Sequence, residues 1–180
     1  MKIHLIIFLT ILTFGISCKQ DRKITATINT TVTDLKGKFE IELPASWHKE
    51  FNTSDISSGI ISSDTTVDMN EVMVINATWN ADTVFINSHL ENVLDSLNET
   101  VGLKTKMSKT GKINEYRTCF NFSFGLDSLN EINRNQLLYV LKSDSIGGHI
   151  LFTAIVYGDS IQESQSELVA EIVKSIEMKK

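Results

Sequence analysis

The histidines of this sequence have spacings that suit neither a metal site nor a catalytic pair. His48 and Glu50 stand two residues apart, as do His89 and Glu91. Metal ligands on one helix face are three or four residues apart, and only on a strand are they two apart. His48 and Glu50 are expected in a loop, and no partner residue is evident for His149. We therefore predict no metal site and no cofactor.

Serine and acidic residues form no recognisable catalytic motif either. The sequence has no Gly-x-Ser-x-Gly turn, and Gly147-Gly148 is not followed by the Gly-Lys-Ser/Thr of a phosphate-binding loop. Other acidic residues are scattered, and those at positions 163, 167 and 171 are typical of a solvated helix face. We predict that the chain is not an enzyme. The alternative is a periplasmic or surface hydrolase whose Ser, His and carboxylate groups meet only in the tertiary structure.

The two cysteines have different surroundings. Cys119 lies among alternating apolar residues with no evident base nearby, which indicates a small buried hydrophobe and not a nucleophile. Cys18 follows an apolar N-terminal run. If Cys18 is modified, as argued below, Cys119 has no partner within the chain, and we expect no disulfide.

The first seventeen residues have the pattern of a secretory signal. Lys2 supplies a positive charge, residues 4–16 are almost all apolar, and Ser17 precedes Cys18. The alternative is an uncleaved anchor, but a membrane-spanning helix needs about 20 apolar residues and this run is shorter. The pattern therefore predicts a signal peptide over residues 1–17.

The end of this segment, Gly15-Ile16-Ser17-Cys18, resembles the lipobox of bacterial lipoproteins. The departure from that motif is Gly15, where an aliphatic residue is usual. The resemblance implies that Cys18 becomes the first residue and receives diacylglycerol and a fatty acid such as palmitate. Stable anchoring takes two acyl chains, because one chain gives only marginal membrane binding. We expect a lipoprotein of the cell envelope, at the outer membrane in preference to the inner, facing the periplasm or the surface.

Length and net charge limit the domain organisation and the partners that the rest of the chain can have. Residues 18–36 are polar and Thr-rich, and we interpret them as the lipidated Cys and a flexible tether that can end in a short strand. Residues 37–180 suit one globular domain. The net charge is −5, and removal of Lys2 with the signal makes it −6. A mildly acidic chain without a local Lys/Arg cluster argues against binding nucleic acid or anionic lipid headgroups.

Most of the domain has the alternating pattern of β-strands. Phe39, Ile41 and Leu43 alternate with glutamates, and Pro44 ends the strand. Residues 71–79 are apolar on both faces, which predicts a central strand. Further strands are expected at residues 57–63, 116–124, 135–143 and 149–157, with Gly147-Gly148 in a hairpin loop. Residues 103–113 are expected to form either a strand or a loose arm of a hairpin.

Two stretches have helical periodicity. Apolar residues recur at spacings of three and four between residues 86 and 101, with Asp82 or Thr83 as the expected cap and Gly102 after the last turn. A second helix is expected after residue 160. Its capping box is Ser160 with Glu163, its apolar stripe runs to residue 176, and its C-terminal cations are Lys174, Lys179 and Lys180. The fold class is therefore α+β, with an antiparallel sheet flanked by helices.

The ends of the domain resemble the PsbP-like family. Residues 39–44 (FEIELP) and Trp47 are similar to the strand, proline and tryptophan that open that family's domain. Thr153–Tyr157 precedes a helix closing in IVKSI (residues 172–176), similar to the family's ending. The resemblance covers about residues 37–177 and implies a small α/β/α sandwich. PsbP-like domains occur in photosystem II accessory proteins, Ran-binding nuclear import factors and bacterial lipoproteins.

The family resemblance implies a binding or assembly role and carries over no catalytic residue, because the family has no shared active site. We therefore expect a membrane-anchored, non-enzymatic accessory module for an envelope protein partner. A small hydrophobic ligand between sheet and helix is a further alternative. Trp47 is open to two interpretations, a core aromatic or a contact with the partner. Trp79 is expected to pack in the core.

Overall fold

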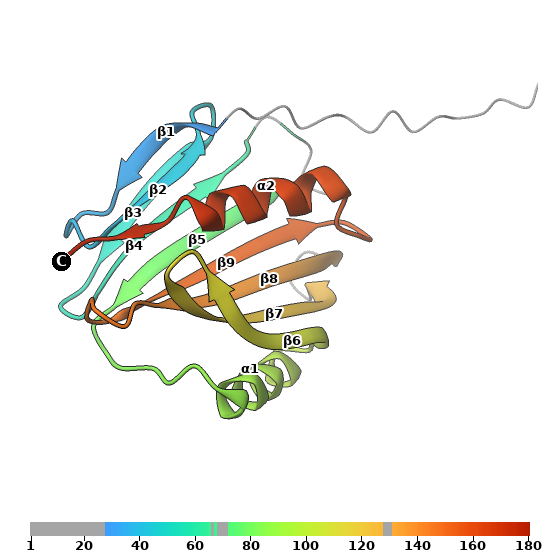
Figure 1. The fold of residues 1–180 in the computed structure, drawn as a ribbon. Coiled ribbons are helices and arrows are strands. Elements are labelled where there is room, and N and C mark those ends of the chain that lie inside the picture. The colour runs from blue at the N-terminus through green and yellow to red at the C-terminus, as the bar shows by residue number, and fades with distance from the viewer. Residues whose placement is uncertain (1–27, 66, 68–71, 128–130) are drawn as a thin grey trace, which may run out of the picture.

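The computed structural model describes residues 28–65, 67, 72–127 and 131–180. These residues form an α+β fold with a large antiparallel sheet, a small sheet and two helices (Figure 1). Cys18 and the signal segment lie outside the described residues. The predicted fold class is confirmed.

The large sheet has seven strands in the order β3-β4-β5-β9-β8-β7-β6. Neighbouring strands are antiparallel throughout, because short turns join most consecutive strands. β5 lies between β4 and β9, which confirms the prediction of a central strand. The bounds are β3 (His48–Thr53), β4 (Ser57–Ser63), β5 (Met73–Asn80), β6 (Lys104–Ile113), β7 (Tyr116–Asp127), β8 (Ile132–Lys142) and β9 (His149–Tyr157).

The small sheet joins the start of the described chain to its end. β1 (Ile28–Thr33) pairs with β2 (Phe39–Pro44), and β2 pairs with β10 (Glu177–Met178). β1 falls within residues 18–36, the segment interpreted as a tether that can end in a short strand, and it pairs with the first strand expected in the domain. The β-strand of residues 48–53 was not expected, since its sequence HKEFNT is mostly polar and lies at a sheet edge.

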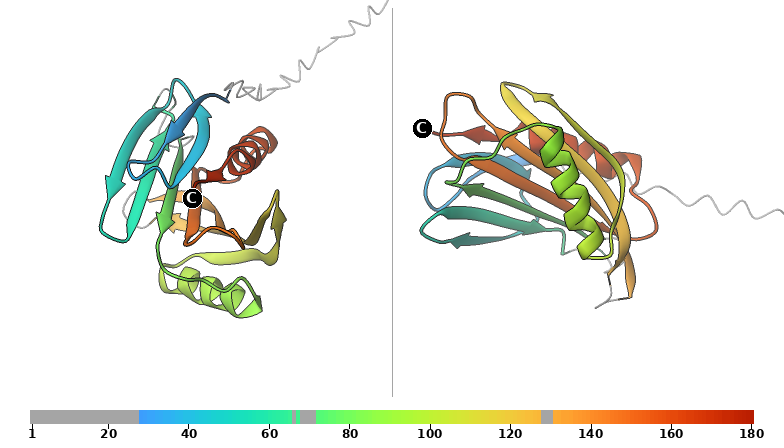
Figure 2. Two further views of the ribbon diagram at one scale, coloured as in Figure 1. Left: turned by 60° about the vertical axis from the view of Figure 1, so that its left-hand side comes forward. Right: turned by 90° about the horizontal axis from the view of Figure 1, so that it is seen from below.

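The helices α1 (Ser88–Thr100) and α2 (Glu163–Lys174) cover opposite faces of the large sheet (Figure 2). Among the described residues, neither helix has the length and hydropathy that a membrane span requires. α2 ends at Lys174, and the chain then enters β10. The prediction that Lys179 and Lys180 end this helix is therefore wrong.

α1 begins later than predicted, because the segment before it is held extended against the sheet. Lys142 Nζ donates to the carbonyl of Val84 at 2.7 Å, and Arg117 Nη2 donates to the carbonyl of Ile86 at 3.1 Å. The cap is Asn87, whose Oδ1 accepts from the amide of Leu90 at 3.1 Å, and not Asp82 or Thr83. Gly102 has the expected left-handed conformation, with φ of 75°.

The cap of α2 also differs from the prediction. Gln162 precedes the helix, and its backbone amide donates to the side-chain oxygen Oε1 of Gln165 at 2.9 Å. Gln165 is buried, so this bond satisfies a polar side chain inside the fold. The predicted pair of Ser160 and Glu163 is therefore displaced by two residues.

Two apolar cores lie on the two faces of the large sheet. The main core fills the space between the sheet, α2 and β2, and its fully buried side chains include Phe39, Phe152 and Ile172. The smaller core lies under α1 and contains Leu94 and Cys119. This placement confirms that Cys119 is a buried hydrophobe. Burial, reinforced by the charges of two nearby carboxylates, raises the pKa of the Cys119 thiol to about 11.

Candidate functional site

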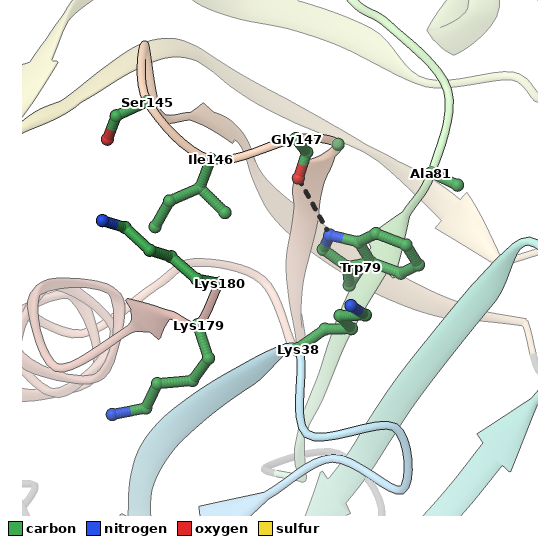
Figure 3. A pocket seen from close by; sticks show the side chains of 9 residues that line it. Lys38, Trp79, Ala81, Ser145, Ile146, Gly147, Lys179 and Lys180 are labelled. Carbon is green, nitrogen blue, oxygen red and sulfur yellow. Dashed lines mark hydrogen bonds between the residues drawn. The ribbon is translucent and has the colours of Figure 1, made fainter.

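Lysines from two separate segments line a hollow of about 380 Å³ beside Trp79, which we call the lysine pocket (Figure 3). Trp79 is near the end of β5, Lys38 precedes β2, and Lys179 and Lys180 follow β10. The β8–β9 loop completes the wall with Ser145, Ile146, Gly147 and Gly148. The volume falls within the range of about 300–1,000 Å³ that is usual for ligand sites.

The indole of Trp79 forms one side of the lysine pocket. Its Nε1 donates to the carbonyl oxygen of Gly147 at 3.4 Å, and the ring packs directly against Gly148. The ammonium nitrogen of Lys38 lies 5.5 Å from the ring centroid, over its face (Figure 3). Trp79 is half-buried, so part of the ring remains open to a ligand. The prediction that Trp79 is simply a packing residue is incomplete.

Lys38 is positioned by the β1–β2 turn. The buried carboxylate of Asp34 accepts hydrogen bonds from the amides of Lys36 at 2.9 Å, Lys38 at 2.6 Å and Phe39 at 2.7 Å. The carbonyl of Lys38 in turn accepts from the amide of Lys179 at 2.7 Å. The turn and the C-terminal segment are thus tied together at the backbone, which brings their lysines to one place.

The three lysines differ in their ionic partners. Lys179 Nζ lies 2.9 Å from Glu40 Oε2 and 3.0 Å from Glu177 Oε2. The hydrogen bonds to these carboxylates raise the pKa of Lys179, and the bond from Lys179 lowers the pKa of Glu40. Lys38 and Lys180 form no ion pair with any residue that the structure describes. The pocket therefore holds the Lys38 ammonium over a half-buried indole, and Lys180 lies farther along its wall, with its side chain pointing away from the ring (Figure 3).

The histidines of the described chain are not brought together. His48 lies 3.1 Å from Glu50 on the exposed strand β3, and His149 Nδ1 lies 3.5 Å from Asp82 Oδ1. His89 lines a shallow hollow of about 260 Å³ whose other walls are mainly apolar or amide side chains. No group of three His, Cys, Asp or Glu in the described ranges could hold a metal ion. The chemistry that the lysine pocket supports is electrostatic and aromatic binding.

Trp47 is a buried residue of the main core. Its side chain is 5% exposed and belongs to the main core. The structure therefore supports the packing interpretation of Trp47, and we do not carry the partner-contact interpretation further. Lys38, Lys179 and Lys180 were not singled out as site residues, because lysines far apart in the sequence give no local signal of a cluster.

No family profile and no curated protein matches this sequence. Solved structures do resemble the fold. Ran-binding protein Mog1p of Saccharomyces cerevisiae aligns with a TM-score of 0.55 at 9% identity, over 83% of this chain and 95% of Mog1p. LpqN of Mycobacterium tuberculosis, a protein involved in cell envelope biogenesis, aligns with a TM-score of 0.54 at 11% identity, over 82% and 88% of the two chains.

The fold is similar to that of Mog1p and LpqN. A structure from Bacteroides thetaiotaomicron is also similar, with a TM-score of 0.53 at 12% identity over 85% of this chain. This chain spans about half the length of that protein, since 49% of it is covered. At these identities the likeness concerns the fold alone. The arrangement of a sheet between helices agrees with the sandwich that the PsbP-like resemblance implies.

Proposed function

We propose that this protein is a non-enzymatic binding module of a bacterial cell envelope, anchored by lipid on Cys18, that binds an acidic segment of a protein partner in the lysine pocket. The observation that carries the proposal is that Lys38 and Lys180, which form no ion pair with a described residue, line the same pocket as the half-buried indole of Trp79, with Lys38 over the ring. Tryptophan is enriched among the residues that contribute most of the binding energy in protein interfaces.

Charge complementarity favours an acidic partner segment. The chain as a whole has a net charge of −5, so a local positive site stands out against an acidic surface. Such an arrangement directs an acidic segment to one place and repels it elsewhere. Mog1p is described as Ran-binding and LpqN as involved in cell envelope biogenesis, and both descriptions are compatible with an accessory binding role on this fold.

The partner-binding proposal is tested by crosslinking the native protein in its own envelope, followed by mass spectrometry. We expect one stoichiometric partner, whose recovery falls about tenfold in Lys38→Gln/Lys180→Gln, because two charge-assisted contacts are lost. The matched control is Lys104→Gln/Lys106→Gln, which removes the same charge from the distant strand β6. Equal recovery with wild type and Lys38→Gln/Lys180→Gln would show that the partner binds elsewhere.

The lipid anchor is tested separately. Cys18→Ser is expected to abolish incorporation of radiolabelled palmitate and to release the protein from the membrane fraction, because the acylated thiol is removed. Cys119→Ser is the control, since Cys119 is buried in the core under α1 and is no acceptor for lipid. A Cys18→Ser protein that still carries palmitate contradicts the anchor but leaves the binding proposal standing.

A further inference from the structure

A second hollow lies on the α2 face of the large sheet, beside the turn that joins β6 to β7. We call it the aromatic hollow; its volume is about 450 Å³. Its apolar walls are Ile113 of β6, Phe120 of β7 and Tyr139 of β8. Gly111 and Thr118 complete them, and Lys109, Thr110 and Lys112 line it along β6. It shares no residue with the lysine pocket.

The aromatic wall is rigidly supported. The ring centroids of Phe120 and Tyr139 are 4.8 Å apart, and that of Tyr139 is 6.0 Å from Phe152, which is fully buried in the main core. Burial also raises the pKa of the Tyr139 hydroxyl, so this side chain stays neutral. A ligand would therefore meet an uncharged aromatic surface whose side chains are already in place.

The hollow exists because residue 111 has no side chain. A Cβ built on Gly111 would have Thr118 Oγ1 as its nearest neighbour, at 3.9 Å, which is an ordinary van der Waals contact. Gly111 is also not among the residues with a left-handed backbone. Neither backbone strain nor a close approach of neighbouring atoms therefore requires glycine at position 111. The lack of a side chain on Gly111 leaves space above the sheet.

The β6–β7 turn is fastened to the rest of the fold at two points. Asn114 Nδ2 donates to the carbonyl of Lys174 at the end of α2, at 2.8 Å, and the amide of Met178 donates to the Tyr116 hydroxyl at 3.0 Å. Figure 1 shows the hairpin rising from the sheet toward α2. The walls of the aromatic hollow are thus fixed in the absence of a ligand, which lowers the entropy lost on binding.

One cation stands at the rim. Lys109 Nζ lies 5.8 Å from the ring centroid of Phe120, and Lys109 forms no ion pair with a residue in the described ranges. Lys112 is paired with Arg117, whose guanidinium bonds the carbonyl of Ile86 on the α1 face, so the Lys112 side chain leaves the strand on that opposite face. β6 carries four lysines and no acidic residue, which protects an edge strand against aggregation, but of the four only Lys109 both lines the hollow and faces it.

We propose that the aromatic hollow binds a small carboxylate with an apolar body, whose apolar part lies against Phe120 and Tyr139 and whose carboxylate pairs with Lys109. The apolar body is aryl or alkyl, and both have the chemistry that the walls accept. This site goes beyond the proposed function, because it uses other residues and a ligand of another class.

The test is equilibrium dialysis of the purified full chain against radiolabelled phenylbutyrate and decanoate, with the corresponding amides as neutral probes. We expect saturable binding of at least one carboxylate at one site per chain. Lys109→Gln should weaken carboxylate binding about fivefold and leave amide binding unchanged, because only the charge-assisted contact is removed. Lys112→Gln, with the same loss of charge on the same strand but on the opposite face, should bind as wild type does.

Gly111→Val supplies a second variant that fills the hollow. This variant should bind neither the carboxylates nor the amides. Its unfolding temperature should equal or exceed that of wild type, because valine favours a strand and meets no close contact here. The proposal is overturned if no carboxylate binds saturably, if Lys109→Gln and Lys112→Gln weaken binding equally, or if Gly111→Val binds normally. Preference for one carboxylate over the other identifies the apolar body.

Discussion

Replacing Gly148 with alanine is expected to lower the free energy of unfolding by about 3 kcal/mol. Most of this loss is expected from steric contacts of the added Cβ that cannot relax. Gly148 has φ of 79°, a conformation that disfavours any Cβ. The added atom would lie 2.4 Å from the carbonyl oxygen of Asn80 and 2.6 Å from Trp79 Nε1. Either the β8–β9 loop or the indole must move, and both are walls of the lysine pocket.

The neighbouring glycine provides the control for this prediction. Gly147 has no heavy atom within 4 Å of a built Cβ and no left-handed backbone, so Gly147→Ala should change the free energy of unfolding by less than about 0.5 kcal/mol. Urea denaturation followed by tryptophan fluorescence measures both variants. Equal stability of the two would show that the indole and the loop adjust freely around residue 148.

Replacing Asp34 with alanine is expected to cost about 3 kcal/mol of folding free energy, because three backbone amides lose a charged acceptor. The Asp34 carboxylate is 4% exposed and accepts from the amides of Lys36, Lys38 and Phe39. The amide of Phe39 is buried, so water cannot readily replace the lost acceptor there. The same change should release the turn that holds Lys38 over Trp79.

Asp34→Asn separates loss of the acceptor from loss of the charge. Asparagine keeps one carbonyl oxygen of similar placement, and we expect a loss of about 1 kcal/mol. Denaturation in urea gives the stabilities. The signals of the Trp79 indole in nuclear magnetic resonance report whether Lys38 still lies over the ring. An unchanged indole signal in Asp34→Ala would mean that the C-terminal segment alone positions Lys38.

The order of strands and helices could be predicted from the sequence, because hydrophobic periodicity is a local property. The alternation of Phe39, Ile41 and Leu43 predicted β2, and the doubly apolar residues 73–75 predicted that β5 is central. Gly102 predicted the end of α1 for the same local reason, since only glycine adopts a left-handed conformation without strain. The strands that were missed or misplaced are polar or very short, as in β3 and β10.

Helix starts were predicted less well, because capping competes with tertiary contacts. Asp82 and Thr83 are suitable caps in isolation, but Lys142 and Arg117 hold the following residues extended by bonding their carbonyls. These donors come from β8 and β7, far along the chain. A local pattern cannot contain that information.

The sequence by itself determined the α+β class, the buried thiol at Cys119 and the expectation of a binding module without a catalytic motif. Only the tertiary structure decided where ligands can bind. Lys38 and Lys179 meet because β2 pairs with β10, and Gly111 opens a hollow because Phe120 and Tyr139 lie on neighbouring strands. Both arrangements depend on the pairing of residues distant in sequence, which periodicity alone does not specify.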